Sequence, residues 1–330
     1  MADTIKISVV LITYNQTLSD IMTTLQSVLR QDFDSFEIII SDDCSTLFPQ
    51  KEIDCEFERV GFEHVQILTN ETNQGIVRNM LCGIRAARGE IVKVISPGDA
   101  FFNSNTLKDI WEYYSGSDVQ IGFGNVVAFF KNPDGSIHPQ DFHAPMTPEL
   151  YREHDYFDQA LYAQIVQTDW IPGCSLFYRR EFILKYLERL SEQYGVMHSE
   201  DLTVPLITLD RLRIGYLDKR ILWYELGTGI SSSGGGSTRS RMYRDHRSFF
   251  DSLQQRYPQN RTVQKAARRF KLREFIALKT PFYGIAKNMK EQSYLKESTT
   301  APPLPKDSFL RQCMSAATNQ SDSLADDSDL

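Results

Sequence analysis

The stretch Glu90-Ile91-Val92-Lys93-Val94-Ile95-Ser96-Pro97-Gly98-Asp99 joins an apolar run to a short polar turn. An apolar run of this length that ends in turn residues is typical of a buried strand. Pro97 and Gly98 bend the chain, and Asp99 follows the bend. In open α/β sheets, ligands bind beyond the carboxyl ends of the strands. A carboxylate here therefore suits a divalent cation held against phosphate groups, although Ser-Pro-Gly-Asp is also an ordinary β-turn.

The chain before this stretch alternates between strand and helix patterns. Three more apolar runs rich in β-branched residues predict strands over residues 5–12, 36–41 and 65–68. Apolar residues at helical spacing predict helices over 18–29 and 73–88. Strands that alternate with helices imply a mostly parallel central sheet flanked by helices. We therefore predict an α/β fold.

Polar clusters follow three of the predicted strands, at Thr13-Tyr14-Asn15, Asp42-Asp43 and Ser96 to Asp99. Turn and helix-cap chemistry accounts for any one cluster, because it favours the same residue types. The ends of parallel strands meet at one edge of a sheet, so the three clusters are expected to lie together. This coincidence favours a ligand site.

Composition narrows the class of protein. The chain has 330 residues and a formal net charge of −7, which indicates one large domain with an appendage and argues against a nucleic-acid binder. Its five cysteines include no Cys-x-x-Cys pair, so we expect reduced thiols and neither a zinc site nor a disulfide framework. The apolar run over 7–12 is too short for a signal peptide or a membrane span, so a cytoplasmic protein is expected.

Taken together, the motifs resemble those of the family 2 glycosyltransferases of the GT-A fold, whose central sheet is Rossmann-like. Each motif is weak alone, but the five occur in the family's order and at familiar spacings. They are Ser8-Val9-Val10-Leu11-Ile12-Thr13-Tyr14-Asn15, Ile40-Ser41-Asp42-Asp43-Cys44-Ser45, Asn73-x-Gly75-x-x-Arg78-Asn79, Ser96-Pro97-Gly98-Asp99 and His198-Ser199-Glu200-Asp201.

The resemblance implies a donor site at the strand ends. Thr13 and Tyr14 match the pocket for the base and ribose, and either Asp42 or Asp43 would hold a pyrimidine ring, since a carboxylate accepts the imide hydrogen. Arg78 matches a basic residue that grips a phosphate or the base edge, with a solvated helix charge as the alternative. The full implied donor set is Thr13, Tyr14, Asn15, Asp42, Asp43, Asn73, Gly75, Arg78, Gly98 and Asp99.

The resemblance also implies a metal ion. Asp99 matches the last acid of the family's Asp-x-Asp motif, which holds Mn²⁺ or Mg²⁺ against the diphosphate and so stabilises the leaving group. Ser96 and Gly98 stand where other members often have acids. Metal binding before the donor arrives is therefore expected to be weak, and metal use itself becomes a question for experiment.

Asp201 matches the family's general base, with Glu200 as its positioning neighbour or substitute. An inverting transfer needs one carboxylate to take the proton from the acceptor hydroxyl. The alternative is structural, because Ser199 could cap a helix whose first turn favours acids.

Two further features are assigned to the acceptor and to a lid. Trp170 lies in the region that lines the acceptor side in the family, where an aromatic ring can stack on a sugar, although core packing explains it equally well. The Gly/Ser-rich segment 231–237 could be a lid that brings Arg241 and Arg244 over a bound diphosphate, or a plain linker.

These patterns suggest four regions. They are a GT-A catalytic domain over 1–230 (donor half 1–100, acceptor half 101–230), a flexible loop over 231–237, a basic helical extension over 238–292 and a disordered tail over 293–330. A basic helix with apolar residues can lie on an anionic membrane, so peripheral contact through 238–290 at the inner face of the plasma membrane is an expectation beside simple packing on the domain.

The resulting prediction is an inverting glycosyltransferase that moves a sugar from a nucleotide-diphosphate donor, with a UDP-sugar expected, to a glycan or lipid-linked acceptor in surface polysaccharide synthesis. One alternative is a non-catalytic scaffold of a polysaccharide-assembly complex, which the thinned Asp-x-Asp motif favours. Another Rossmann-type nucleotide enzyme is disfavoured, because no Gly-x-Gly-x-x-Gly follows the first strand.

Overall fold

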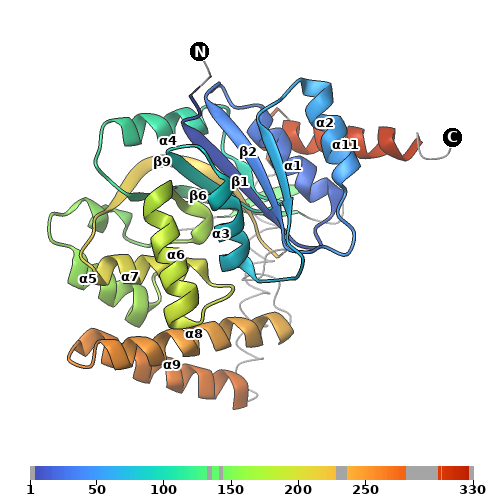
Figure 1. Cartoon of the computed structure of the whole chain (residues 1–330). Helices are drawn as coiled ribbons and strands as arrows, with labels where there is room; N and C mark the ends of the chain where they lie inside the picture. The colour runs from blue at the N-terminus through green and yellow to red at the C-terminus, as the bar shows by residue number, and fades with distance from the viewer. Residues whose placement is uncertain are drawn as a thin grey trace.

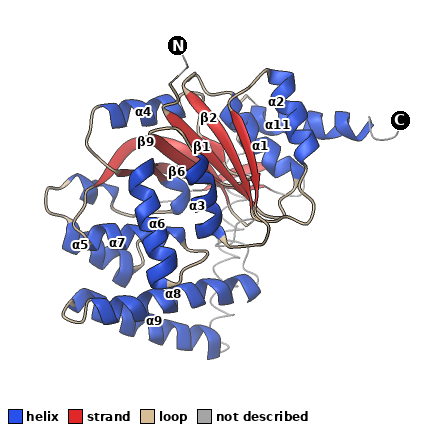
Figure 2. Ribbon diagram, in the orientation of Figure 1, coloured by secondary structure: helices blue, strands red, loops and turns tan. Residues whose placement is uncertain are grey.

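A single mixed β-sheet forms the centre of the computed structural model, which describes residues 4–131, 136–140, 144–227, 236–279, 304–305 and 307–326. The strand order is β3-β2-β1-β4-β8-β6-β9-β5, with β7 paired to β6. Helices cover both faces of the sheet (Figures 1 and 2). The predicted α/β class is therefore confirmed.

The amino-terminal half is the predicted alternation of strands and helices. Strands β1, β2, β3 and β4 run parallel, and Thr13 at the end of β1 lies opposite Asp42 at the end of β2. The elements are β1 (Ile7–Thr13), α1 (Leu18–Leu29), β2 (Phe36–Asp42), α2 (Gln50–Val60), β3 (Val65–Thr69), α3 (Ile76–Ala86) and β4 (Ile91–Ile95).

The second half adds strands of mixed direction. Strand β8 runs antiparallel to β4 and β6, whereas β9 runs parallel to β6 and antiparallel to β5. The strands are β5 (Ala100–Phe101), β6 (Ile121–Lys131), β7 (Ile137–Gln140), β8 (Leu176–Arg179) and β9 (Ile214–Glu225). The helices are α4 (Thr106–Ser115), α5 (Phe157–Leu161), α6 (Arg180–Tyr194) and α7 (Thr203–Leu209), with short helical turns η1 (Pro148–Arg152), η2 (Tyr162–Gln167), η3 (Gly173–Ser175) and η4 (Glu200–Leu202).

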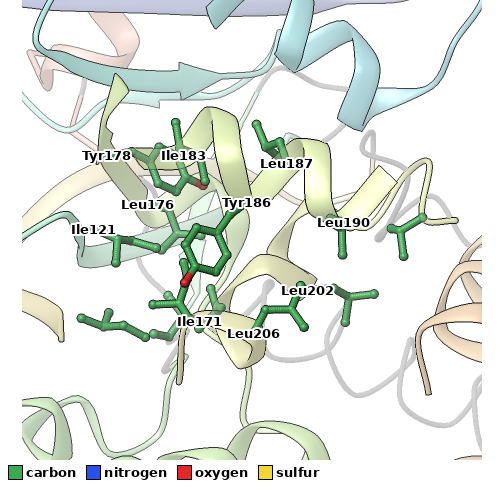
Figure 3. Close-up of a cluster of buried hydrophobic side chains, with 14 of the residues drawn as sticks. Ile121, Ile171, Leu176, Tyr178, Ile183, Tyr186, Leu187, Leu190, Leu202 and Leu206 are labelled. Atoms are coloured by element: carbon green, nitrogen blue, oxygen red, sulfur yellow. The ribbon is translucent and has the colours of Figure 1, made fainter. Parts of the chain in front are cut away.

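Alternate residues of the central strands supply two separate apolar cores. Val10 of β1 packs with α3 and α6, whereas Val9 and Leu11 pack with α1, α2 and α4 on the opposite face. Burial of both faces explains why the parallel strands read as continuous apolar runs. Figure 3 shows part of the first core, where Ile183 and Leu187 of α6 lie near Leu176 and Tyr178 of β8.

Helices α8 (Gly236–Arg256) and α9 (Arg261–Lys279) pack side by side, next to α6 (Figure 1). Phe249 and Leu253 of α8 and Ala266 of α9 are buried in the same core as α6. Packing on the domain thus accounts for the inner face of this basic pair, and membrane contact stays a prediction. No helix within the described ranges is long and apolar enough to cross a bilayer.

The carboxyl-terminal region differs from the expected disordered tail. Residues Phe309–Asp326 form helix α11, which packs against α1 (Figure 1). Leu310, Cys313 and Ala317 are fully buried, and their i, i+3, i+7 spacing places them on one face of the helix. The surrounding Ser, Thr and Asp residues outnumber these few apolar residues, so the composition of the segment wrongly predicted disorder over 309–326.

The buried face of α11 predicts a measurable contribution to stability. Leu310 packs with Ala100, Phe129 and Trp223, so the substitution Leu310→Ala should lower the free energy of unfolding by about 2–4 kcal/mol in urea titrations. Ser315→Ala on the exposed face of α11 is the matched control and should change it by less than about 0.5 kcal/mol. Equal stability of the two variants would mean that α11 does not pack in solution.

Candidate active site

The ends of β1 and β2 are joined by a buried acid. The Thr13 hydroxyl donates to Asp42 Oδ1 at 2.8 Å, and Asp42 also accepts from the Ser45 backbone N–H at 2.7 Å and the Ser45 hydroxyl at 2.5 Å. Thr13 and Asp42 are both buried. Asp42 therefore holds the turn after β2 in shape.

Asp43 instead holds the start of α3. Its carboxylate accepts the backbone N–H groups of Gln74 and Gly75, each at 2.8 Å, and the Asn70 side-chain amide at 3.1 Å. Gly75 has a positive φ of 85°, and a Cβ there would lie 2.8 Å from the Met197 carbonyl oxygen, so only glycine fits. Asp43 thus fixes the loop that carries the Asn73-x-Gly75 motif.

The other implied donor residues divide between the two loops and the surface. Asn15 links the loops after β1 and β2, because its backbone N–H donates to Ser45 Oγ at 2.7 Å and its side-chain oxygen accepts the Thr46 N–H at 2.8 Å. Tyr14 and Asn73 are exposed. Arg78 is also exposed, and its Nε donates to Ser191 Oγ of α6 at 3.4 Å, so it lies against that helix.

Asn79 is a buried residue of the same motif that lies outside the implied donor set. Its side chain donates to the Ser41 carbonyl at 2.8 Å and accepts from the Ser41 hydroxyl at 2.7 Å and the Asn70 amide at 3.1 Å. It therefore ties α3 to the end of β2. Its position directly after Arg78 in the motif could have identified it from the sequence.

The Ser-Pro-Gly-Asp turn is held by helix α1. The Thr24 hydroxyl donates to the Asp99 carbonyl oxygen at 2.7 Å and accepts the Gly98 N–H at 3.1 Å. Asp99 Oδ1 in turn accepts the backbone N–H of Glu225, the last residue of β9, at 3.0 Å. Burial raises the pKa of Asp99 to about 8, although this hydrogen bond opposes the shift.

A buried lysine lies beneath this turn. Lys93 of β4 has no exposed surface, and its Nζ donates to the carbonyl oxygens of Val94 at 2.8 Å and Cys174 at 2.6 Å. Burial lowers the pKa of Lys93 to about 8, and attraction to Asp99 acts in the opposite direction. Lys93 was not among the predicted site residues, although a lysine within an apolar run is unusual and could have pointed to it.

The second acidic group lies on the turn η4 before α7. Glu200 packs against Gly173, where a Cβ would collide with its Oε1. Burial raises the pKa of Glu200 to about 8, with repulsion from Asp201 adding to the effect, and burial also raises the pKa of Asp201. Leu202 follows Asp201 directly and anchors this turn in the core drawn in Figure 3.

The alternative reading of Ser199 as a helix cap is wrong. Its side chain makes no capping hydrogen bond, and its buried hydroxyl has no partner within the described residues. The loop is held instead by Asp245 of α8, whose Oδ2 accepts the backbone N–H groups of Met197, His198 and Ser199 at 3.2, 2.6 and 3.2 Å.

Asp245 and α3 together fix the loop that leads to the acid pair. The Met197 carbonyl accepts the Val77 N–H of α3 at 2.9 Å, so the loop before Glu200 directly contacts the first turn of α3. Burial alone would raise the pKa of Asp245, but the hydrogen bonds from His198 and the neighbouring backbone hold it below its usual value. No sequence pattern pointed to Asp245.

The residues assigned to the acceptor and the lid lie at the α8 side. Trp170 is half-buried, and its ring meets that of His246 edge-on, with centroids 6.0 Å apart. Arg241 and Arg244 are exposed on α8. Residues 231–235 of the expected lid lie outside the described residues, and 236–237 belong to the first turn of α8.

Asp99, Lys93 and Glu200 all lie near one short segment, because their charges act on the pKa of the Cys174 thiol. Lys93, beneath Asp99, bonds the Cys174 carbonyl, and Glu200 packs on Gly173 next to it. Within the described ranges, no group of three or more His, Cys, Asp or Glu side chains is arranged to hold a metal ion. A site here would need the oxygen atoms of a bound ligand to complete it.

A parallel strand-helix half joined to a mixed half, with acids beyond the strand ends, is the architecture of GT-A glycosyltransferases. The model of Glycosyl transferase family 2 matches residues 8–187, more than half of the chain, and the chain belongs to this family.

Two curated relatives match shorter stretches. The poly(ribitol-phosphate) beta-N-acetylglucosaminyltransferase TarS of Staphylococcus aureus is 33% identical over 147 residues, which are 44% of this chain and 24% of TarS. An uncharacterized glycosyltransferase of Haemophilus influenzae is 30% identical over 100 residues, which are 29% of this chain and 30% of that protein. The chain therefore spans less than a third of the length of the curated relatives it matches.

Solved structures extend the likeness over most of the chain. The crystal structure of S. aureus TarS 1-349 in complex with UDP-GlcNAc superposes with a TM-score of 0.52 at 18% identity, covering 96% of this chain and 88% of that one. A further crystal structure of TarS 1-349 gives a TM-score of 0.50 at 19% identity, with 83% and 75% covered. At this level of identity the likeness shows the fold alone.

The contacts of Asp245 predict a large effect on stability. Replacing it by alanine leaves three backbone N–H groups without their acceptor, so Asp245→Ala should lower the free energy of unfolding at pH 7 by about 3 kcal/mol. Because the folded pKa of Asp245 is lowered, this contribution is complete above the unfolded value near 4 and is lost as the pH falls through the folded value.

Denaturant titrations at pH 7 and pH 3 measure this effect. Asp251→Ala, on the same helix, is the matched control, because the ion pair of Asp251 with Lys271 is half-exposed and should contribute less than about 1 kcal/mol. A loss for Asp245→Ala no larger than that of the control would contradict the assigned role.

Proposed function

We propose that this protein is an inverting glycosyltransferase that uses a UDP-sugar donor, with Asp201 as the general base. The observation that supports the proposal best is that Asp99 and Glu200 both lie close enough to Cys174 for their charges to act on it, while Glu200 packs on Gly173. This arrangement separates an acid suited to the leaving diphosphate from an acid pair suited to the acceptor hydroxyl.

The donor assignment draws on the relatives. TarS is named as an N-acetylglucosaminyltransferase, and TarS 1-349 was crystallised with UDP-GlcNAc, so UDP-GlcNAc is the first donor to test. For the acceptor we propose a glycan or lipid-linked polymer of the cell surface. Membership of family 2 argues against a different Rossmann-type enzyme. The assay below distinguishes an active transferase from a non-catalytic scaffold.

In the proposed reaction, the acceptor hydroxyl attacks the anomeric carbon from the side opposite the diphosphate. Asp201 takes the hydroxyl proton, while Glu200 beside it, whose pKa is raised to about 8 by burial and by repulsion from Asp201, stays protonated at neutral pH. Lys93 holds the Cys174 segment through a hydrogen bond, and its charge acts on Asp99. Asp99 is the residue that would hold Mn²⁺ or Mg²⁺, which when bound neutralises charge on the diphosphate.

The test of the general base is Asp201→Asn. This variant keeps the shape of the side chain but cannot take a proton, so the rate of UDP release from UDP-GlcNAc with acceptor should fall at least 100-fold, while UDP affinity measured by calorimetry stays within about threefold. Asp158→Asn is the matched control, since Asp158 is exposed and only pairs weakly with Arg211 at 3.5 Å. Full activity in Asp201→Asn would reject the assignment.

If incubation with a panel of nucleotide sugars releases no diphosphate from any of them, the result favours a non-catalytic scaffold over a transferase. The panel assay on the full chain measures diphosphate release and so tests catalysis. UDP binding is measured separately by calorimetry.

The paired acids predict the pH dependence. Asp201 acts in its ionised form, so kcat should rise with pH and reach a plateau above its raised pKa. Repulsion from ionised Asp201 contributes to the raised pKa of Glu200, which is about 8, so Asp201 ionises while Glu200 is still protonated. Glu200→Gln removes no charge in that state and should leave the acid limb within about 0.3 pH units of the wild type. The profile of kcat from pH 5 to pH 9 measures its position, and a larger shift in either direction would contradict this order of ionisation.

A further inference from the structure

The Ser96-Pro97-Gly98-Asp99 turn provides one carboxylate where other family members often provide more. Gly98 has a positive φ of 92°, and a Cβ at this position would collide with Glu225 Oε2. The space that a side chain at position 98 would occupy is therefore filled by the carboxylate of Glu225. A residue distant in the sequence thus supplies an acid where the turn lacks one.

The sheet fixes this meeting of distant residues. Ala100 and Phe101 of β5 pair with Trp223 and Leu222 of β9, which brings Glu225 alongside the turn. The Glu225 backbone N–H donates to Asp99 Oδ1 at 3.0 Å across 126 positions of sequence. The two acidic side chains are consequently held on one rigid framework.

The Glu225 carboxylate has no hydrogen-bond donor within the part of the chain that the structure describes. Only 6% of the residue is exposed. The charges that act on it are the like charge of Asp20 and the opposing charge of Lys131, while Lys93 directs its ammonium to two carbonyl oxygens. A buried carboxylate without a donor is costly, and a bound cation removes that cost.

We propose that Glu225 is the second protein carboxylate of the divalent cation site, acting with Asp99 in place of the acid missing at position 98. The inference rests on the proposed function, because the remaining ligands are phosphate oxygens of the nucleotide and waters. Mg²⁺ is commonly bound by one or two carboxylates plus substrate phosphates, and Mn²⁺ accepts the same oxygen ligands.

A purely structural role for Glu225 makes a different prediction. Its contact with Asp99 runs through the backbone N–H, which any residue at position 225 would keep. Glutamine also fills the same space over Gly98. If Glu225 only supports the turn, its charge is dispensable and Glu225→Gln should behave like the wild type.

The experiment measures Mn²⁺ binding to the full chain in the presence of saturating UDP, from the electron paramagnetic resonance signal of free Mn²⁺. Glu225→Gln and Asp99→Asn should each weaken Mn²⁺ binding at least tenfold. Glu63→Gln, an exposed residue before the amino end of β3, is the matched control and should leave it unchanged. Glu225→Ala, which keeps the backbone N–H, serves as a second variant, and thermal unfolding checks that all variants are folded.

The outcomes separate the inference from the proposed function. Wild-type Mn²⁺ affinity in Glu225→Gln, with a loss in Asp99→Asn, overturns the role of Glu225 and leaves a metal site at Asp99. No Mn²⁺ binding by the wild type with UDP bound overturns the cation site altogether. UDP affinity measured in EDTA should be equal in the wild type and Glu225→Gln, and it reports nucleotide binding independently of the metal.

Discussion

The hydrogen bond from Lys93 Nζ to the Cys174 carbonyl is the contact on which the arrangement of the site depends. It joins the middle of β4 to the segment before β8, where parallel and antiparallel parts of the sheet meet. A buried ammonium is tolerated there because two carbonyl oxygens replace part of its water shell. Asp99 and Glu200 both act on Cys174 of that segment, and Glu200 packs on Gly173.

Around this centre, acids are used as structural anchors as well as chemical groups. Asp43 holds the start of α3, and Asp245 holds the loop before Glu200, each by accepting backbone N–H groups. The Val77–Met197 hydrogen bond connects the two loops. The loop before Glu200 is therefore tied both to the start of α3 and to α8, and α8 belongs to the domain rather than to a separate appendage.

The sequence predicts the first four strands correctly but not helix α11 or the loop at Ser199, for physical reasons. The first four strands were predictable because both of their faces are buried, which leaves uninterrupted apolar runs. Helix α11 was missed because only Leu310, Cys313 and Ala317 mark its inner face among many polar residues. Ser199 looked like a helix cap because capping preference is local, whereas its loop is held from a distance by Asp245.

The sequence by itself determined the α/β alternation, the polar clusters at the strand ends and the ordered motifs of the family, since each of these is written in neighbouring residues. Only the tertiary structure decided which groups meet: Glu225 against Gly98, Asp245 against the loop at Met197, and Lys93 against Cys174. Those contacts join residues far apart in the chain. They depend on how the sheet pairs and how helices pack on it, and periodicity in a local stretch does not encode that pairing.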